Sequence, residues 1–122
     1  MPNRGIRGSV LFIAGLMGVF GVAAAAAASH GADPRLLGGA SAMCLAHAPA
    51  LVALHAGWAY FRTAAVSALL LAAGTAIFAA DLTMRHFAGH GLFPMSAPLG
   101  GLTMMAGWLA VAMGAFLPRK AD

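Results

Sequence analysis

The chain has 122 residues, of which 61% are hydrophobic and only 8% charged, and its formal net charge is +4. At this length it forms one domain at most, and a soluble domain normally carries about 25% charged residues. The composition therefore excludes an ordinary soluble fold and favours a protein whose main partner is the lipid bilayer. The basic residues are scattered, without the patch and interleaved aromatic residues of a nucleic-acid-binding surface, so no nucleic-acid partner is expected.

Four long apolar segments account for most of the sequence, and the charged residues gather between them. A bilayer core about 30 Å thick requires roughly 20 helical residues, and each segment is close to that length. Continuous alanine and leucine favour helices over barrel strands, in which polar and apolar residues alternate. The sequence predicts an all-α, integral membrane, four-helix antiparallel bundle as a single domain over residues 1–122, with spans at about 8–29, 36–60, 64–83 and 98–117.

The basic residues also predict the orientation of the bundle. Five fall on one side of the four spans, namely Arg4, Arg7, Arg62, Arg119 and Lys120, and two fall on the other, Arg35 and Arg85. By the positive-inside rule, both termini are expected to be cytoplasmic. The loops after the first and third spans are then expected on the outer face.

The first segment has an alternative interpretation as a cleaved signal peptide. Two arginines and an apolar stretch precede an alanine-rich run, which is the general order of such a signal. The apolar stretch is about 20 residues long, however, whereas a signal core has about 7 to 15. The length favours a helix that is retained.

Small residues recur at helical spacing on the first and last spans. They are Gly15, Gly18 and Gly21 on the first, and Ala106, Ala110 and Gly114 on the last. Lipid supplies little hydrophobic force between helices, so small residues are expected where helix backbones approach closely. These stripes predict either ordinary packing within the bundle or a face for self-association or partner docking.

The second span contains the densest set of polar side chains. At about 100° per residue, Ser41, Cys44, His47 and His55 share a stripe of roughly 120° that is expected to face the bundle interior. An ionisable residue at the mid-membrane depth of His47 is a candidate for haem or metal ligation, proton relay, or a hydrogen bond to a quinone or lipid. The alternative is a neutral imidazole bonded to a neighbouring helix, because burial disfavours the charged form.

A second polar cluster is expected at the outer face. Its members are His30, Asp33, Asp81, Arg85, His86 and His90. Asp81 and Arg85 are four residues apart on one helical face and can form an ion pair. Histidine and carboxylate side chains are ligand types for zinc or copper, but no spacing in the cluster is diagnostic. The favoured interpretation is a solvated loop with an ordinary salt bridge and no metal.

The segment Ala97–Leu109, with the sequence APLGGLTMMAGWL, resembles the closing signature of a bacterial family of small inner-membrane proteins. That family is the domain of unknown function number 423, which is similar to the mitochondrial transmembrane protein 256 group. The residues that carry the signature are Pro98, Gly100, Gly101, Gly107 and Trp108.

Other stretches match the same family in the same order. They are Ala27-Ala28-Ser29-His30, Ala46-His47-Ala48 and residues 74–82. Cys44 stands where the family usually has glutamine, and Ala79-Ala80-Asp81 replaces its Ser-Gly-Ser. The resemblance implies four transmembrane helices in a bacterial inner membrane and no established activity.

Three functions are compatible with these features. The leading interpretation is a non-catalytic structural or accessory subunit that packs against a larger membrane complex, with other integral membrane subunits as partners and no cofactor. The second is a small transporter or channel component that uses the polar stripe around His47. The third is a haem, metal or quinone binder that uses the five histidines. No motif supports enzyme activity.

Overall fold

Four helices form the structure, a computed structural model that describes residues 4–60 and 62–118. They are α1 (Arg4–His30), α2 (Arg35–Ala56), α3 (Ala64–Ala88) and α4 (Ser96–Met113), and the described residues contain no strand. By length and composition, all four are able to cross a membrane. The prediction of an all-α membrane protein built as a four-helix bundle is confirmed.

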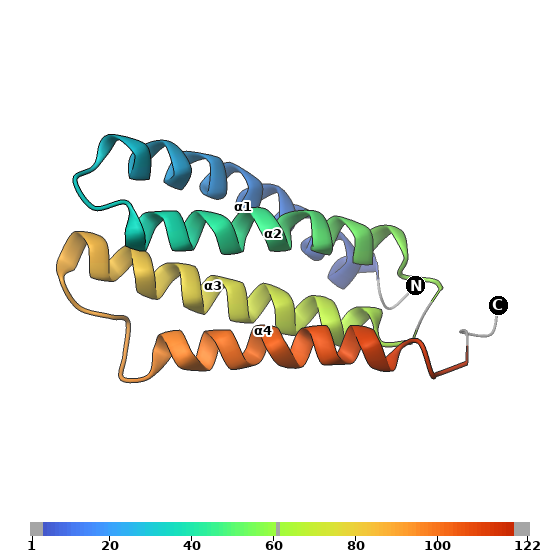
Figure 1. Ribbon diagram of the computed structural model, residues 1–122. Coiled ribbons are helices and arrows are strands. Elements are labelled where there is room, and N and C mark those ends of the chain that lie inside the picture. Colours follow the sequence, from blue (N-terminus) through green and yellow to red (C-terminus); the bar gives the residue numbers. More distant parts are fainter. Residues whose placement is uncertain (1–3, 61, 119–122) are drawn as a thin grey trace.

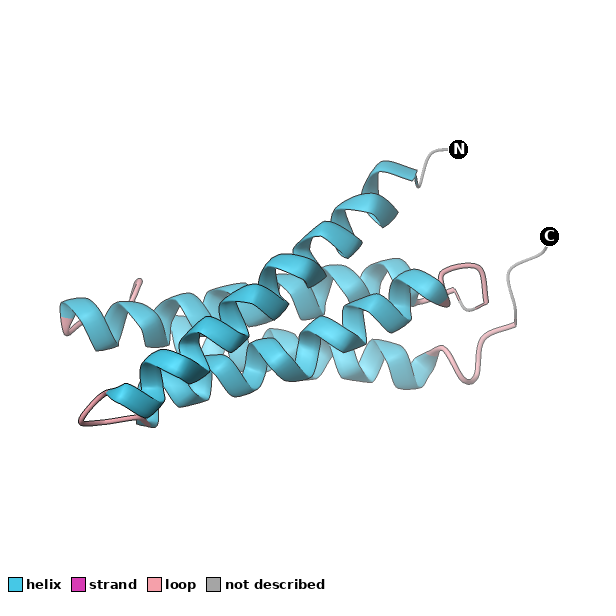
Figure 2. Cartoon of the chain, turned by 90° about the horizontal axis from the view of Figure 1, so that it is seen from above, coloured by secondary structure: helices cyan, strands magenta, loops and turns pink. Residues whose placement is uncertain are grey.

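Consecutive helices run antiparallel and pack side by side, with α1 against α2, α2 against α3 and α3 against α4 (Figure 1). The start of α1, the α2–α3 connection and the end of α4 therefore share one end of the bundle, here called the terminal end. The α1–α2 and α3–α4 connections lie at the opposite, loop end. Helix α1 crosses the others obliquely and leans on α3 over only part of its length (Figure 2).

Several helix boundaries differ from the predicted spans, and α1 begins at Arg4 rather than at residue 8. Helix α3 continues five residues beyond residue 83 to Ala88 and is capped by Gly89, whose φ of 80° lies in the left-handed region that glycine tolerates. Helix α2 ends at Ala56 rather than near residue 60, because a turn follows in which the Tyr60 amide donates to the Gly57 carbonyl at 2.8 Å. Helix α4 ends at Met113 rather than 117.

The terminal end is held by contacts from two arginines. Arg7 Nε donates to the His55 carbonyl at 3.2 Å, and Arg62 Nε donates to the Pro118 carbonyl at 3.2 Å. These bonds join the start of α1 to the end of α2, and the α2–α3 connection to the segment after α4. Arg119 and Lys120, which contribute to the predicted orientation, lie outside the described residues.

Glycine allows α3 and α4 to approach closely. A Cβ atom at Gly74 would lie 2.7 Å from the Met104 backbone nitrogen, and one at Gly100 would lie 2.8 Å from the Phe78 backbone nitrogen. Backbone atoms cannot move aside as a flexible side chain can, so this contact requires residues without a Cβ atom. The two glycines therefore set the distance between α3 and α4.

Of the three small residues predicted to form a stripe on α1, one packs against a neighbouring helix and two do not. Gly21 is buried, and a Cβ atom there would lie 2.7 Å from the Leu45 side chain of α2. Gly15 and Gly18 have no neighbouring atom within 4 Å of their Cβ positions. Gly21 thus packs within the bundle, whereas Gly15 is exposed and Gly18 half-buried, each with open space beside it.

On α4, the buried face differs from the predicted stripe. The buried residues are Ser96, Gly100, Met104 and Gly107. By contrast, Ala106 is exposed, and Ala110 and Gly114 are half-buried. In a helix this rich in small residues, spacing alone does not identify the contact face, which is the one that matches Gly74 on α3.

Candidate functional site

His47 lies in the bundle interior, with 5% of its surface exposed. Its Nδ1 is 2.8 Å from the Met43 carbonyl oxygen one turn earlier, and its Nε2 is 3.1 Å from Nε1 of Trp108 on α4. A carbonyl oxygen only accepts and an indole N–H only donates, so Nδ1 carries the proton and Nε2 is the acceptor. Both nitrogens of a neutral imidazole are therefore occupied.

The geometry of the bundle brings His47 and Trp108 to the same depth. Helices α2 and α4 run in the same direction, and each residue lies twelve positions after the first residue of its helix, Arg35 or Ser96. The two helices make no close backbone contact within the described residues, so the indole bridges the gap between them. The ring centroids are 5.8 Å apart.

The other residues of the predicted polar stripe also face neighbouring helices. The Ser41 hydroxyl donates to the Gly21 carbonyl oxygen on α1 at 2.7 Å. The half-buried His55 has its Nδ1 2.9 Å from the Arg7 carbonyl oxygen. Cys44 is buried and has a free thiol. Three of the four stripe residues thus fasten α2 to α1 or α4 through hydrogen bonds.

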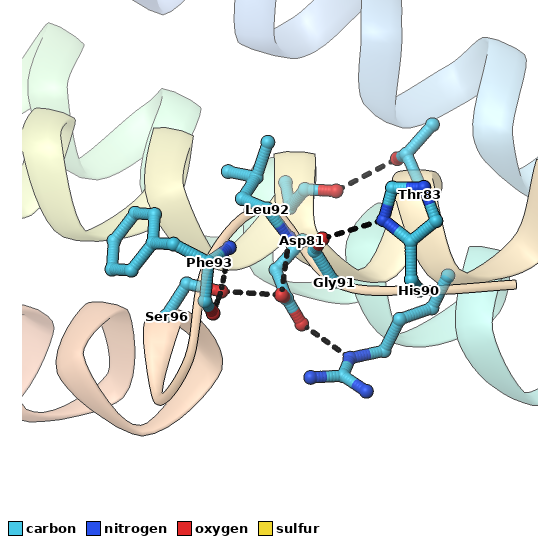
Figure 3. Close-up of polar contacts among 9 residues, drawn as sticks. Asp81, Thr83, His90, Gly91, Leu92, Phe93 and Ser96 are labelled. Atoms are coloured by element: carbon cyan, nitrogen blue, oxygen red, sulfur yellow. Dashed lines mark hydrogen bonds and ion pairs between the residues drawn. The ribbon is translucent and has the colours of Figure 1, made fainter. Parts of the chain in front are cut away.

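Asp81 organises the loop end of α3 and α4 (Figure 3). Its carboxylate is fully buried and accepts hydrogen bonds from Arg85 Nε at 2.7 Å, from the Leu92 amide at 3.1 Å and from the Ser96 hydroxyl. A buried carboxylate is costly unless it is paired and hydrogen-bonded, and here three donors compensate it. Gly91 lies so close that a Cβ atom there would collide with the Asp81 carboxylate.

The ion pair expected from the spacing of Asp81 and Arg85 is present, but the expected solvated loop is wrong for this pair. Both residues belong to α3, and Asp81 lies seven positions before Ala88, about 10 Å inside the end of the helix. The side chain of Arg85 is 44% exposed, so the pair reaches the surface through the guanidinium.

The remaining members of the predicted outer cluster do not converge. The side chain of Asp33 accepts the Arg35 amide at 3.0 Å, the His86 ring packs edge-on against Phe87, and His90 Nδ1 lies 2.9 Å from the Gly91 carbonyl oxygen. His30 is the last residue of α1. Within residues 4–60 and 62–118, no three His, Cys, Asp or Glu side chains are grouped to hold a metal ion.

An apolar groove of about 550 Å³ opens between α1 and α3. Its α1 wall carries larger side chains and its α3 wall is rich in alanine, with Leu92 of the α3–α4 connection beside them. The lining residues are Ile13, Leu16, Met17, Phe20, Cys44, Ala76, Ala79, Ala80, Thr83, Met84, Phe87 and Leu92. Cys44 and Thr83 supply the polar side chains of this lining, and the Thr83 hydroxyl already donates to the Ala79 carbonyl at 2.7 Å.

Sequence reasoning did not identify Trp108 as the partner of His47 or Ser96 as a partner of Asp81. For Trp108, the available signal is its offset from the start of α4, which equals that of His47 in a helix of the same direction. For Ser96, the signal is a serine at the start of a helix, where its hydroxyl commonly binds nearby polar groups. Both signals depend on knowing where α4 begins, which is two residues before the predicted start at Pro98.

Comparisons with known protein families, curated proteins and solved structures found no match. The role of the polar residues is therefore inferred from the hydrogen bonds that they make. Those contacts join the polar side chains of the bundle to one another and to backbone carbonyls.

Proposed function

We propose that the protein is a small non-catalytic integral protein of the bacterial inner membrane, a structural or accessory subunit that packs against a larger membrane complex. The observation that carries the proposal is the use of the polar stripe inside the bundle. Ser41 and His55 bind carbonyl groups of α1, and His47 binds Trp108 of α4. Polar side chains in membrane proteins commonly join helices in this way, and this use leaves neither nitrogen of His47 available for other chemistry.

The outward face of α1 supports docking against other membrane subunits. Gly15 and Gly18 have open space beside them, and Phe12 and Val19 are 67% and 72% exposed. Glycines on a membrane helix allow a second helix to approach its backbone, and the neighbouring large side chains provide contact area. Helix α1 packs mainly against α2, so its opposite side is free to accept a partner helix.

We also infer that both termini are cytoplasmic and that the resemblance to the family of unknown function number 423 reflects membership. Arg4, Arg7 and Arg62 share the terminal end, as the positive-inside rule requires for this orientation. His47 and Trp108, which match the second-helix histidine and last-helix tryptophan of that family, are hydrogen-bonded to each other. Gly100 and Gly107 of its signature are buried.

Transport, or ligation of haem or metal through His47, has weaker support. A metal would need a ring nitrogen that now binds Met43 or Trp108, and a proton relay would need to break one of the same bonds. A narrow bundle of four helices also offers little room for a pathway within one copy of the chain.

Purification from native membranes in a mild detergent tests the proposal. We expect integral membrane proteins to co-purify with the chain in fixed stoichiometry, as measured by quantitative mass spectrometry. The double variant Gly15→Leu and Gly18→Leu should reduce their yield at least about tenfold, because its added side chains keep a partner helix away. Gly101→Leu is the matched control, since Gly101 on α4 also has open space beside it.

Two results would contradict the proposal. One is a chain that purifies alone under these conditions, with no stoichiometric partner. The other is a loss of partners that is the same in Gly101→Leu as in the α1 variant, because the outward face of α1 would then have no special role.

A further inference from the structure

The groove between α1 and α3 follows from the packing of both helices. Gly21 and Ser41 hold α1 close to α2, and from there α1 runs obliquely across the bundle (Figure 2). On the facing side, α3 presents Ala76 and Ala80, whose short side chains are exposed and do not fill the space. The result is a hollow of about 550 Å³ that opens on the side of the bundle.

We propose that this groove binds one acyl chain of a phospholipid from the membrane leaflet at the loop end. Ala76 is the middle residue of α3, and the groove continues from there to Phe87 and Leu92 at the loop end. The eleven helical steps from Ala76 to Phe87 rise about 16 Å, which is close to half of a hydrocarbon core about 30 Å thick. The groove therefore has the length and the position of a single acyl chain in one leaflet.

The size of the groove distinguishes an acyl chain from a helix of another protein or of a second copy. A helix is about 10–12 Å across. The two walls of the groove, α1 and α3, contact each other over part of their length, which leaves no room for a whole helix between them. A helix can cover the rim but cannot enter the hollow, whereas a narrow flexible chain can.

The chemistry of the lining distinguishes an acyl chain from a quinone. A quinone ring needs hydrogen-bond donors for its carbonyl oxygens, as polar ligands generally do in their sites. The polar side chains of the lining are Cys44 and Thr83, and the Thr83 hydroxyl donates to Ala79 of its own helix. A saturated chain needs no donor. An apolar hollow of this kind also does not hold ordered water, so hydrocarbon is its natural content.

Native mass spectrometry of the purified chain tests the inference. The protein is extracted without its partners, washed with detergent until bulk lipid is removed, and offered a phosphatidylethanolamine with a palmitoyl and an oleoyl chain. We expect one phospholipid to remain bound per chain. The variant Ala76→Leu and Ala80→Leu should retain at least about fivefold less, because its side chains fill the groove from the α3 wall.

The matched control is Ala106→Leu and Ala112→Leu, which adds the same side chains at exposed positions of α4 outside the groove. It should retain the phospholipid as the unmodified chain does. A second groove variant, Leu16→Ala and Phe20→Ala, removes the opposite wall without adding bulk. It should also retain less lipid, which keeps the test decisive if the filled variant fails to fold.

Three outcomes would overturn the inference: no retained phospholipid in the unmodified chain, equal retention by the groove variants and the α4 control, or a quinone as the retained molecule. None of these outcomes bears on docking through the outward face of α1. The lipid site and the proposed subunit role are therefore tested separately.

Discussion

The indole N–H of Trp108 and Nε2 of His47 lie 3.1 Å apart and join α2 to α4, two helices whose backbones make no close contact within the described residues. The second ring nitrogen of His47 binds the Met43 carbonyl of its own helix. An ionisable residue in the middle of a membrane span is thereby used as a neutral structural link. The same pattern holds for Ser41, which binds a carbonyl of α1.

The carboxylate of Asp81 is expected to dominate the stability of the loop end. Asp81→Ala removes the carboxylate that accepts hydrogen bonds from Arg85, from the Leu92 amide and from the Ser96 hydroxyl. We expect the free energy of unfolding to fall by about 2 kcal/mol, because the buried Ser96 hydroxyl loses a hydrogen bond to a charged group, whereas the half-exposed Arg85 guanidinium can be solvated by water. Unfolding in mixed detergent micelles with increasing dodecyl sulfate measures the change.

Asp33→Ala is the control for that variant, because the exposed Asp33 side chain accepts one hydrogen bond from the residues that the structure describes, from the Arg35 amide. Its cost should stay below about 1 kcal/mol, as for the loss of a single exposed hydrogen bond. Equal losses in the two variants would mean that burial of the Asp81 carboxylate has no energetic importance.

The close contact of α3 and α4 predicts an unusual sensitivity to one methyl group. Gly74→Ala places a Cβ atom 2.7 Å from the Met104 nitrogen, so the helices must separate, at a cost of about 2 kcal/mol. Gly101→Ala has open space and should be neutral or stabilise the helix by up to about 1 kcal/mol. The same unfolding assay compares them, and a Gly74→Ala variant as stable as Gly101→Ala would show that α4 does not pack as described.

The number, type and order of the helices were predictable because long apolar segments have few other solutions in a bilayer. The ion pair of Asp81 and Arg85 was predictable from their spacing alone. The end of α3 was not predictable, because the charged residues Asp81 and Arg85 suggest that the membrane span stops near them. Besides Arg85, the Leu92 amide and the Ser96 hydroxyl stabilise Asp81 inside the helix, and they lie 11 and 15 residues further along the chain.

The helix contacts and the partner of His47 were also not predictable from the sequence. The interior position of His47 follows from the polar face of its helix, but its partner depends on the relative direction and depth of α2 and α4. The packing glycines, Gly74 and Gly100, are not distinguished by spacing from the many other small residues. Only the structure pairs them across the contact.

The orientation of the bundle can be measured by labelling single cysteines. In a Cys44→Ala background, which removes the chain's own thiol, Ala32→Cys lies in the α1–α2 connection and Ala59→Cys in the α2–α3 connection, both exposed. Neither change alters the charges that set orientation. In intact cells, an impermeant maleimide should label position 32 but not position 59 until the membrane is broken. The reverse pattern would place both termini outside the cytoplasm.

The central claim is that His47 serves to hold helices together, and a double-mutant cycle with Trp108 tests it most directly. Unfolding free energies are measured for the unmodified chain, His47→Ala, Trp108→Phe and the double variant. The hydrogen bond predicts a coupling energy of about 0.6 to 1.7 kcal/mol, the range for such bonds in membrane proteins. Additive losses, with no coupling between the two changes, would contradict the account and leave His47 open to a different role.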